Sequence, residues 1–318
     1  MNIPMKRLLA CLLCLLPFVS GGAQKFVFTP QWTPQSQFAG YYVALEKGFY
    51  REAGLDVEIV HPSPSNSAIN RLLSGKSHAV SLQLVQAIQY SDRDTPLVNV
   101  LQTSQNSSMM FVSREPLKNS LHSLRGKKVG RWLAGFHEMA DVVDKKYGLD
   151  IEWIPFVQNI NLFVSGAIDA TLAMYYNEYF QLLSAGFRFG KENLVFFSDL
   201  GYNIPEDGLY VTREYYRRDA RRIRLFAQAS RRGWEWAAQH PEEALDMVMK
   251  QVRLHHVGTN RETQKWMLHE ILKAQKERKS GKATFRLSPG AFEQTNRMLL
   301  EGGFIRRSIS YDQITGRL

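Results

Sequence analysis

The tryptophan at position 32 lies in a polar stretch that also carries Gln35 and Gln37. An indole offers a flat apolar surface on which a heteroaromatic ring stacks, and glutamine amides can hydrogen-bond the edges of such a ring. Tyr41 follows in the first turns of the next predicted helix and could close the wall, with core packing as the alternative for its ring. These residue types predict a binding site for a small, flat, polar molecule.

A second group, Tyr175, Asn177 and Glu178, follows the apolar segment 170–174. The carboxylate of Glu178 could accept from an exocyclic amine and match a protonated ring nitrogen. A solvated helix position is the alternative, because glutamates are mostly exposed. The sequence thus predicts a carboxylate facing the indole of Trp32 across a shared gap.

The remaining candidates lie near other predicted strand ends. Trp132 and Phe136 could form the wall of a second half of the protein, and Gln83 and Asn203 add amides. Arg131, beside Trp132, could pair with an anionic group of the ligand, or it could be an exposed, solvated arginine.

The elements that position the first group form a strand, a loop, a helix and a second strand. Residues 25–29 read as a strand, and 38–45 place apolar side chains at i, i+3, i+4 and i+7 of a helix. Ser36 is the predicted N-cap and Gly48 the predicted stop. Residues 55–59 alternate apolar and acidic side chains, which indicates a half-buried strand.

The same unit returns about 90 residues later. Gly-Leu-Asp at 148–150 repeats 54–56 at an offset of 94, and Ser-Gly at 165–166 repeats 74–75 at an offset of 91. A nearly constant register indicates two similar α/β halves, with chance similarity of short strings as the alternative.

Alternating strands and helices predict parallel sheets, whose ligands bind beyond the carboxyl ends of the strands. We expect an α/β fold of two Rossmann-like lobes with a hinge of crossover strands. The first lobe is assigned residues 24–112 plus 208–318, and the second lobe residues 113–207. Segments 97–103 and 107–113 are predicted as strands that make the first crossing, and the C-terminal helices are expected to pack on the first lobe.

The N-terminus predicts export. Lys6 and Arg7 precede an apolar run and a small-residue site, which is typical of a signal peptide over residues 1–23, cleaved after Ala23. Both cysteines lie inside it, so the mature protein has neither a disulfide nor a cysteine-based metal site. We therefore expect a periplasmic protein.

The charge pattern argues against nucleic-acid binding, and the motif search argues against catalysis. Without Lys6 and Arg7 the net charge falls from +10 to +8, and acidic residues are interleaved with the basic runs. Solvated helix faces explain this pattern better than nucleic-acid binding. No Walker loop, nucleophile elbow or zinc-protease motif occurs, so the sequence predicts no catalytic centre, cofactor or metal.

Six segments of the chain carry a family resemblance. They are WTPQSQFAGYYVA (32–44), KGFY (47–50), GLDV (54–57), SGK (74–76), LRGKKVG (124–130) and SGAIDA (165–170). With these segments the chain resembles the family that joins periplasmic thiamine-pyrimidine and sulfonate binding proteins to the fungal thiamine pyrimidine synthases. The resemblance implies a type II periplasmic binding fold that feeds an ABC importer, with a heteroaromatic ligand in the cleft.

The synthase branch of that family implies a lysine that holds pyridoxal phosphate, a histidine that supplies ring atoms and a cysteine-rich run. Alignment from Ser74 places Leu82 at the lysine position and Gln86 at the histidine position, and residues 202–206 contain no cysteine. Leucine has no amine with which to form a Schiff base. We therefore expect a monomeric binding protein, partnered by a heteroaromatic ligand and an ABC permease. A pyrimidine synthase, or a sensor lobe for a membrane signalling protein, is the alternative.

Overall fold

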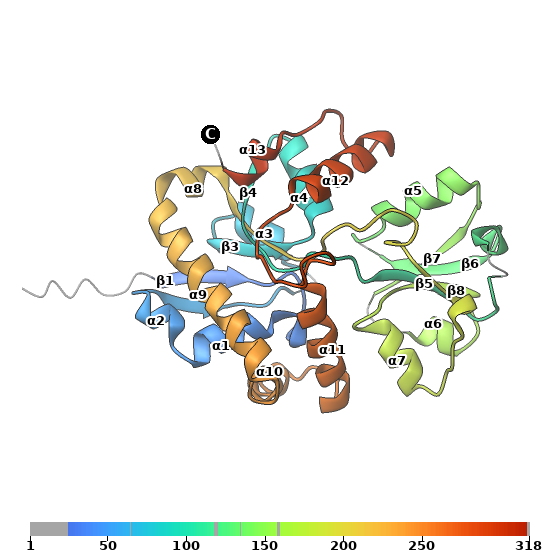
Figure 1. Ribbon diagram of the computed structural model, residues 1–318, viewed down its shortest axis with the longest axis horizontal. Helices are drawn as coiled ribbons and strands as arrows, with labels where there is room; N and C mark the ends of the chain where they lie inside the picture. Colours follow the sequence, from blue (N-terminus) through green and yellow to red (C-terminus); the bar gives the residue numbers. More distant parts are fainter. Residues whose placement is uncertain (1–24, 64, 118–119, 134, 158–159, 317–318) are drawn as a thin grey trace, which may run out of the picture.

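The computed structural model describes residues 25–63, 65–117, 120–133, 135–157 and 160–316. The predicted signal peptide, residues 1–23, lies outside the described residues. Figure 1 shows two lobes side by side, each built around its own sheet.

The first sheet has the strand order β2-β1-β3-β10-β4. β1 pairs in parallel with both β2 and β3, whereas β10 runs antiparallel to β3 and β4. The predicted strands at 25–29 and 55–59 are confirmed as β1 and β2. The bounds are β1 (Lys25–Thr29), β2 (Asp56–Ile59), β3 (Ala79–Leu82), β4 (Leu97–Gln102) and β10 (Gly208–Thr212).

The second sheet repeats this plan with the order β7-β6-β8-β5-β9. β6 pairs in parallel with β7 and β8, and β5 runs antiparallel to β8 and β9. In each sheet, four strands therefore run in one direction, and the fifth strand, which arrives from the other lobe, runs against them. The bounds are β5 (Met109–Ser113), β6 (Lys128–Trp132), β7 (Glu152–Phe156), β8 (Ala170–Met174) and β9 (Leu194–Phe196).

The chain crosses between the sheets twice. Residues 103–108 join β4 to β5, and residues 197–207 join β9 to β10. The two crossings are hydrogen-bonded together: Thr103 N and Ser104 N both donate to the carbonyl of Asp207, at 3.0 Å. Ser104 Oγ in turn accepts from the backbone N–H groups of Glu206 and Asp207. This paired joint is the hinge.

The helices surround both sheets. Those before the first crossing are α1 (Ala39–Glu46), α2 (Phe49–Glu52), α3 (Ala68–Leu73) and α4 (Leu84–Asp92), and those of the second lobe are α5 (Glu138–Tyr147), α6 (Asn161–Val164) and α7 (Glu178–Ser184). After β10 follow α8 (Arg213–Arg218), α9 (Ala220–Gln239), α10 (Pro241–Leu254), α11 (Arg261–Ala274), α12 (Pro289–Glu301) and α13 (Tyr311–Thr315). Short 3-10 turns occur at η1 (Ser36–Phe38), η2 (Leu121–Leu124) and η3 (Lys191–Asn193). None of the described helices is long and apolar enough to span a bilayer.

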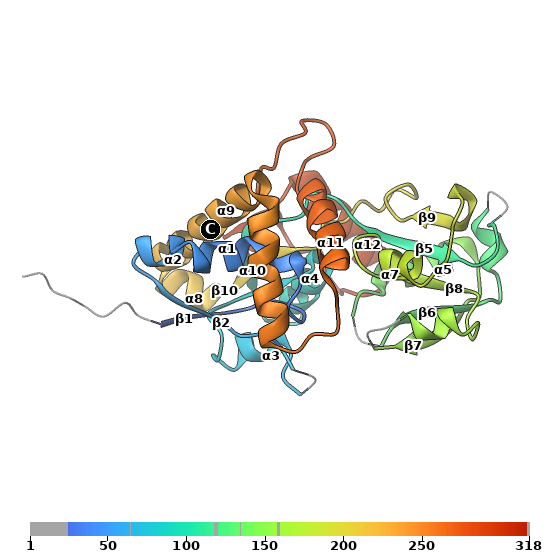
Figure 2. The ribbon, with the colours of Figure 1, turned by 90° about the horizontal axis from the view of Figure 1, so that it is seen from below.

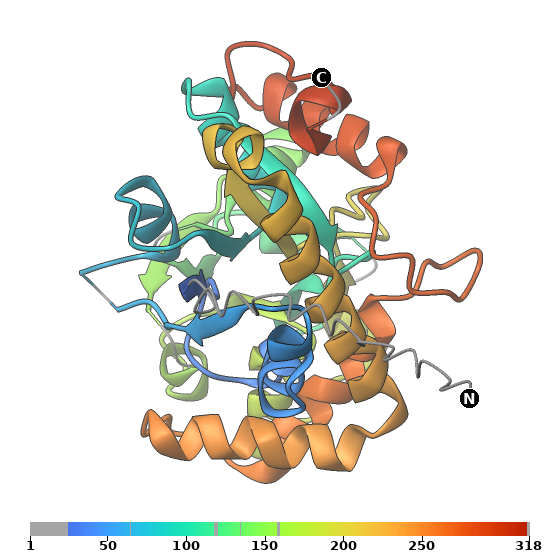
Figure 3. The same ribbon diagram turned by 90° about the vertical axis from the view of Figure 1, so that its left-hand side faces the viewer.

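The C-terminal helices pack on the first lobe, as expected from the sequence, and two of them also contact the second lobe. α9 and α10 pack on α1, and Figure 3 shows α9 running along the first sheet. However, α11 also contacts α7, and α12 also contacts α5, so both reach the second lobe. Figure 2 shows these two helices at the junction between the lobes.

The predicted helix at 38–45 is confirmed as α1, and Gly48 ends it with a positive φ of 78°. The predicted N-cap role of Ser36 is wrong. Ser36 lies in η1, is fully buried, and its hydroxyl donates to the carbonyl of Gln264 on α11.

A close helix contact explains the glycine at position 40. Gly40 on α1 faces Trp234 of α9, and a Cβ added at Gly40 would lie 2.2 Å from that indole. Gly233 is its counterpart, since a Cβ there would lie 2.0 Å from the carbonyl oxygen of Gly40. The two glycines let α1 and α9 approach closely.

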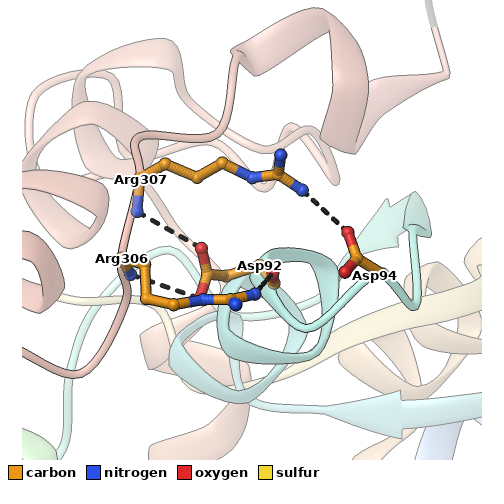
Figure 4. Close-up of polar contacts among 4 residues, drawn as sticks. All are labelled: Asp92, Asp94, Arg306 and Arg307. Carbon is orange, nitrogen blue, oxygen red and sulfur yellow. Dashed lines mark hydrogen bonds and ion pairs between the residues drawn. The ribbon is translucent and has the colours of Figure 1, made fainter.

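A buried carboxylate fastens the C-terminal segment to α4 (Figure 4). Asp92 accepts hydrogen bonds from the backbone N–H groups of Arg306 and Arg307 and from Arg306 Nε. Burial would raise the pKa of Asp92, but these hydrogen bonds and the nearby guanidinium hold it below its ordinary value. Asp94 makes a surface ion pair with Arg307, and both of these side chains are exposed.

Replacement of Gly40 by alanine is expected to destabilise the protein. Alanine gains about 1 kcal/mol of helix propensity over glycine, but overpacking against Trp234 costs about 1–3 kcal/mol and outweighs it. Urea unfolding of Gly40→Ala measures the net loss. The control is Gly258→Ala, where an added Cβ meets nothing within 4 Å, so its stability is expected to stay at or slightly above wild type.

Asp92→Asn is expected to lower the free energy of unfolding by about 2–4 kcal/mol, because it leaves charged and backbone donors facing an amide. The difference should be largest above pH 4 and shrink as acid protonates Asp92 in the wild type, since its pKa is lowered in the fold. Asp94→Asn, at an exposed pair, is expected to change stability by less than about 1 kcal/mol. Equal losses in the two variants would contradict this account.

Candidate ligand-binding site

A cavity of about 370 Å³, including its open mouth, lies between the two lobes. It is built at the carboxyl ends of parallel strands, where α/β sheets place their ligand sites. The first lobe contributes residues after β1 and β3, and the second lobe contributes residues at and after the ends of β6 and β8. The lining residues are Gln31, Trp32, Gln35, Gln37, Gln83, Trp132, Phe136, Met174, Tyr176, Asn177 and Glu178.

Aromatic rings form one part of the wall. Phe136 lies between the two tryptophans, with its ring centroid 6.1 Å from Trp32 and 5.9 Å from Trp132, both edge to face. Phe136 has a φ of 62°, a left-handed conformation that is unusual for a bulky residue. Such backbone strain is found mainly where the surrounding structure must aim a side chain.

A neutral histidine holds the loop of Trp32 in place. His61 Nδ1 donates to the backbone carbonyl of Trp32 at 2.7 Å, so its Nε2 is left to accept from the Tyr42 hydroxyl at 2.9 Å. Burial lowers the pKa of His61 to about 4. The imidazole is therefore neutral near pH 7, and Tyr42 supports the site from the core without lining it.

Glu178 forms the acidic part of the wall. It is 5% exposed and accepts from Met174 N at 2.9 Å and from Asn177 Nδ2 at 3.0 Å. Burial raises the pKa of Glu178 to about 6, and hydrogen bonds from Met174, Trp132 and Asn177 limit the rise. At neutral pH this side chain is a carboxylate, and it lines the same cavity as Trp32.

The glutamines of the first lobe are oriented by a carboxylate behind them. Asp207 accepts from Nε2 of Gln31 and from Nε2 of Gln37. Gln35 Nε2 donates to Gln37 Oε1. Gln31 Oε1 is buried and has no hydrogen-bond partner within the part of the chain that the structure describes. An unpaired acceptor of this kind suits a ligand N–H donor.

The cavity has an acceptor-rich character. Among the described residues that line it, none is a lysine, arginine or histidine, and Glu178 is the one carboxylate. Across the described ranges, no cluster of three or more histidine, cysteine, aspartate or glutamate side chains is arranged to hold a metal ion. The arrangement favours ligands that donate hydrogen bonds and disfavours phosphates and sulfonates.

Two predicted site residues, Tyr41 and Arg131, lie outside the cavity because their side chains point away from it. Tyr41 is 1% exposed and packs in the core, 4.4 Å from Phe28 and 5.8 Å from Trp234 between ring centroids. Arg131 pairs with Asp141 at 2.8 Å. It precedes Trp132 on β6, and successive strand residues point to opposite faces, so Arg131 turns away from the cavity.

Tyr175 and Asn203 also lie outside the cavity. Tyr175 stacks on Tyr179 with ring centroids 4.9 Å apart, whereas its neighbours Met174 and Tyr176 line the site. Asn203 belongs to the hinge, where its Oδ1 accepts from Ser107 N at 2.9 Å.

Sequence reasoning missed four residues of the site: Gln31, Met174, Tyr176 and Asp207. Gln31, Met174 and Tyr176 are immediate neighbours of predicted candidates, so a wider window at each strand end would have included them. Asp207 follows another acid, Glu206, directly before a strand, and this buried acidic pair was a usable signal.

Two α/β lobes of this topology, joined by paired crossings around a cleft, define the type II periplasmic binding fold. Solved structures agree. The periplasmic aliphatic sulphonate binding protein SsuA from Escherichia coli has a TM-score of 0.64 at 15% identity, covering 91% of this chain and 96% of that one. A ligand binding component of an ABC-type import system from Staphylococcus aureus has a TM-score of 0.66 at 11% identity, covering 92% and 96%.

The chain belongs to the family described as NMT1/THI5 like, which matches residues 35–244. It is 24% identical over 238 residues to a formylaminopyrimidine-binding protein from Halalkalibacterium halodurans, covering 69% of this chain and 68% of that protein. It is 24% identical over 157 residues to a 4-amino-5-hydroxymethyl-2-methylpyrimidine phosphate synthase from Saccharomyces cerevisiae, covering 47% and 46%. The predicted family and fold are confirmed.

The buried acid of the hinge predicts a pH dependence. Burial raises the pKa of Glu206 to about 8, although hydrogen bonds from Ser108 and Ser107 oppose the rise. The folded state then keeps a proton that the unfolded state loses near pH 4.5, so stability falls as pH rises from 4.5 to 8, by at most about 1.4 kcal/mol per pH unit. Glu206→Gln is expected to remove this contribution to the pH dependence of stability, because the amide does not titrate.

The test measures the unfolding free energies of wild type and Glu206→Gln from pH 5 to 8.5. The difference between the two curves is compared, because other groups titrate in the same range and affect both proteins. Glu293→Gln, at an exposed position, is the matched control and should run parallel to wild type. A Glu206→Gln curve that also runs parallel to wild type would contradict a protonated Glu206.

Proposed function

We propose that the protein binds a small heteroaromatic solute that carries amino groups and no phosphate or sulfonate. The observation that carries the proposal is the position of Trp32 and Glu178, one from each lobe, in the lining of the same cavity. The indole stacks on the ring, and the carboxylate accepts from an exocyclic amine or a protonated ring nitrogen.

The binding mechanism is closure of the second lobe, residues 113–207, on the first lobe, residues 24–112 plus 208–318. The ligand contacts both lobes only when they approach, so it stabilises the closed arrangement. We further propose that the mature chain is exported to the periplasm and, as a monomer, delivers its ligand to an ABC permease. Relatives that are binding proteins support this assignment.

A binding role is favoured over pyrimidine synthesis by the residues at the synthase positions. Leu82 lies on β3 with 3% of its surface exposed, and Gln86 lies on α4. Neither side chain can take the part of a lysine that forms an imine or of a histidine that donates ring atoms.

The test is a titration of the mature protein with a 4-aminopyrimidine, its phosphate ester and an aliphatic sulfonate, followed by tryptophan fluorescence. The aminopyrimidine is expected to bind, and the two anions at least about tenfold more weakly, a difference of about 1.4 kcal/mol. Trp32→Ala and Glu178→Gln are each expected to weaken aminopyrimidine binding about 10- to 100-fold.

The control is Arg131→Gln, which removes a cation outside the cavity and should change the dissociation constant less than about threefold. Preferential binding of the phosphate ester, or a loss in Arg131→Gln as large as in Glu178→Gln, would overturn the proposal.

A further inference from the structure

The lobes meet at a second place, outside the cavity, where α11 contacts α7. Trp266 of α11 stacks on Phe180, with ring centroids 5.0 Å apart and 16° between the planes. Its indole N–H donates to the backbone carbonyl of Tyr175 at 3.1 Å, and the two rings are 5.4 Å apart. One side chain of the C-terminal region thus makes an aromatic and a polar contact with the opposite lobe.

The same helix is fixed to the polar wall of the first lobe. Gln264, two residues before Trp266, accepts from Ser36 N through its Oε1 at 2.7 Å, and its own carbonyl accepts from Ser36 Oγ at 2.7 Å. Gln264 and Ser36 are almost completely buried. Ser36 stands between Gln35 and Gln37, both of which line the cavity.

The residues of the second lobe that Trp266 contacts also lie close to the cavity. Tyr175 and Phe180 flank Glu178, which begins α7 and lines the cavity. α11 therefore bridges the ligand-facing loop of the first lobe and the ligand-facing segment of the second. These contacts exist only when the lobes are together, because Trp266 belongs to one lobe's scaffold and both of its partners belong to the other.

We propose that Trp266 is a positioning residue that latches the lobes in the closed state and so raises affinity without touching the ligand. The apparent dissociation constant of a closing receptor is its intrinsic value divided by the fraction of molecules in the competent state. A latch changes that fraction alone. It therefore alters the affinity for every ligand of the cleft by the same factor and leaves their ratio unchanged.

The experiment compares the full mature chain with its Trp266→Leu and Trp266→Phe variants. The affinity measurements rest on the proposed function, because they need a ligand that binds. Dissociation constants for two aminopyrimidines of different affinity are expected to rise about 5- to 50-fold in Trp266→Leu, within the range of allosteric couplings, with their ratio unchanged. Trp266→Phe keeps the ring but loses the N–H donor, so it is expected to fall between wild type and Trp266→Leu.

The control is Trp236→Leu. Trp236 is a half-buried tryptophan that stacks on His240, 4.3 Å away, within the first lobe. Its replacement should leave both dissociation constants within about twofold of wild type. Thermal unfolding of all variants separates loss of the latch from loss of the fold.

Small-angle X-ray scattering of the ligand-free protein measures how open the lobes are without the need for a ligand. Trp266→Leu is expected to have a larger radius of gyration than wild type and than Trp236→Leu. If no aminopyrimidine binds wild type, the proposed function fails while scattering still decides the latch. An unchanged radius of gyration, unchanged affinities, or a shifted ratio between the two ligands would overturn the latch.

Discussion

The buried aspartate at position 207 joins the hinge to the polar wall of the cavity. Its backbone carbonyl accepts from Thr103 and Ser104 of the other crossing, and its carboxylate accepts from Gln31 and Gln37. Since these groups are buried, each donor must find an acceptor, and the amide orientations are fixed. The N–H sides of both glutamines turn toward Asp207, which leaves Gln31 Oε1 as an acceptor without a partner among the described residues.

This constraint gives the cavity its electrostatic character. The first lobe presents the amide oxygen of Gln31, the second presents the Glu178 carboxylate, and no cationic side chain lies among the lining residues that the structure describes. A cleft of this composition stabilises hydrogen-bond donors and amines. Proteins with the same fold include sulphonate binders, and the comparison illustrates that the fold provides a cleft while the residues at its strand ends decide what the cleft accepts.

The two sheets are built on the same plan, but the helices that follow β10 break the symmetry. They are attached to the first lobe, and two of them, α11 and α12, extend to the second. Helices attached to the first lobe therefore contact the second lobe directly. In the proposed closure, interactions outside the cavity then contribute to the closed state, because the free energy of closing is shared between the cavity and these contacts.

Most of the fold could be predicted from local signals. Alternating side chains marked β2, the apolar spacing marked α1, and the repeated Gly-Leu-Asp string indicated the duplication. Part of the site's composition followed as well. Trp32, Gln83 and Glu178 come soon after strand ends, and parallel strands place those ends on one edge of a sheet. Chain order and the geometry of parallel sheets therefore determined that these side chains lie near a common cleft.

The tertiary structure decided which side chains face the cleft and what orients them. Tyr41 could not be placed from periodicity because α1 is buried nearly all round: it packs on α9 and α10, and Tyr41 contacts Phe28 of β1, so that no polar face marks a direction. Asp207 acts on Gln31 across 176 residues of sequence, and Trp266 reaches Tyr175 across 91. Local pattern carries no information on such pairs, because they exist only once the lobes have folded and the chain has crossed between them twice.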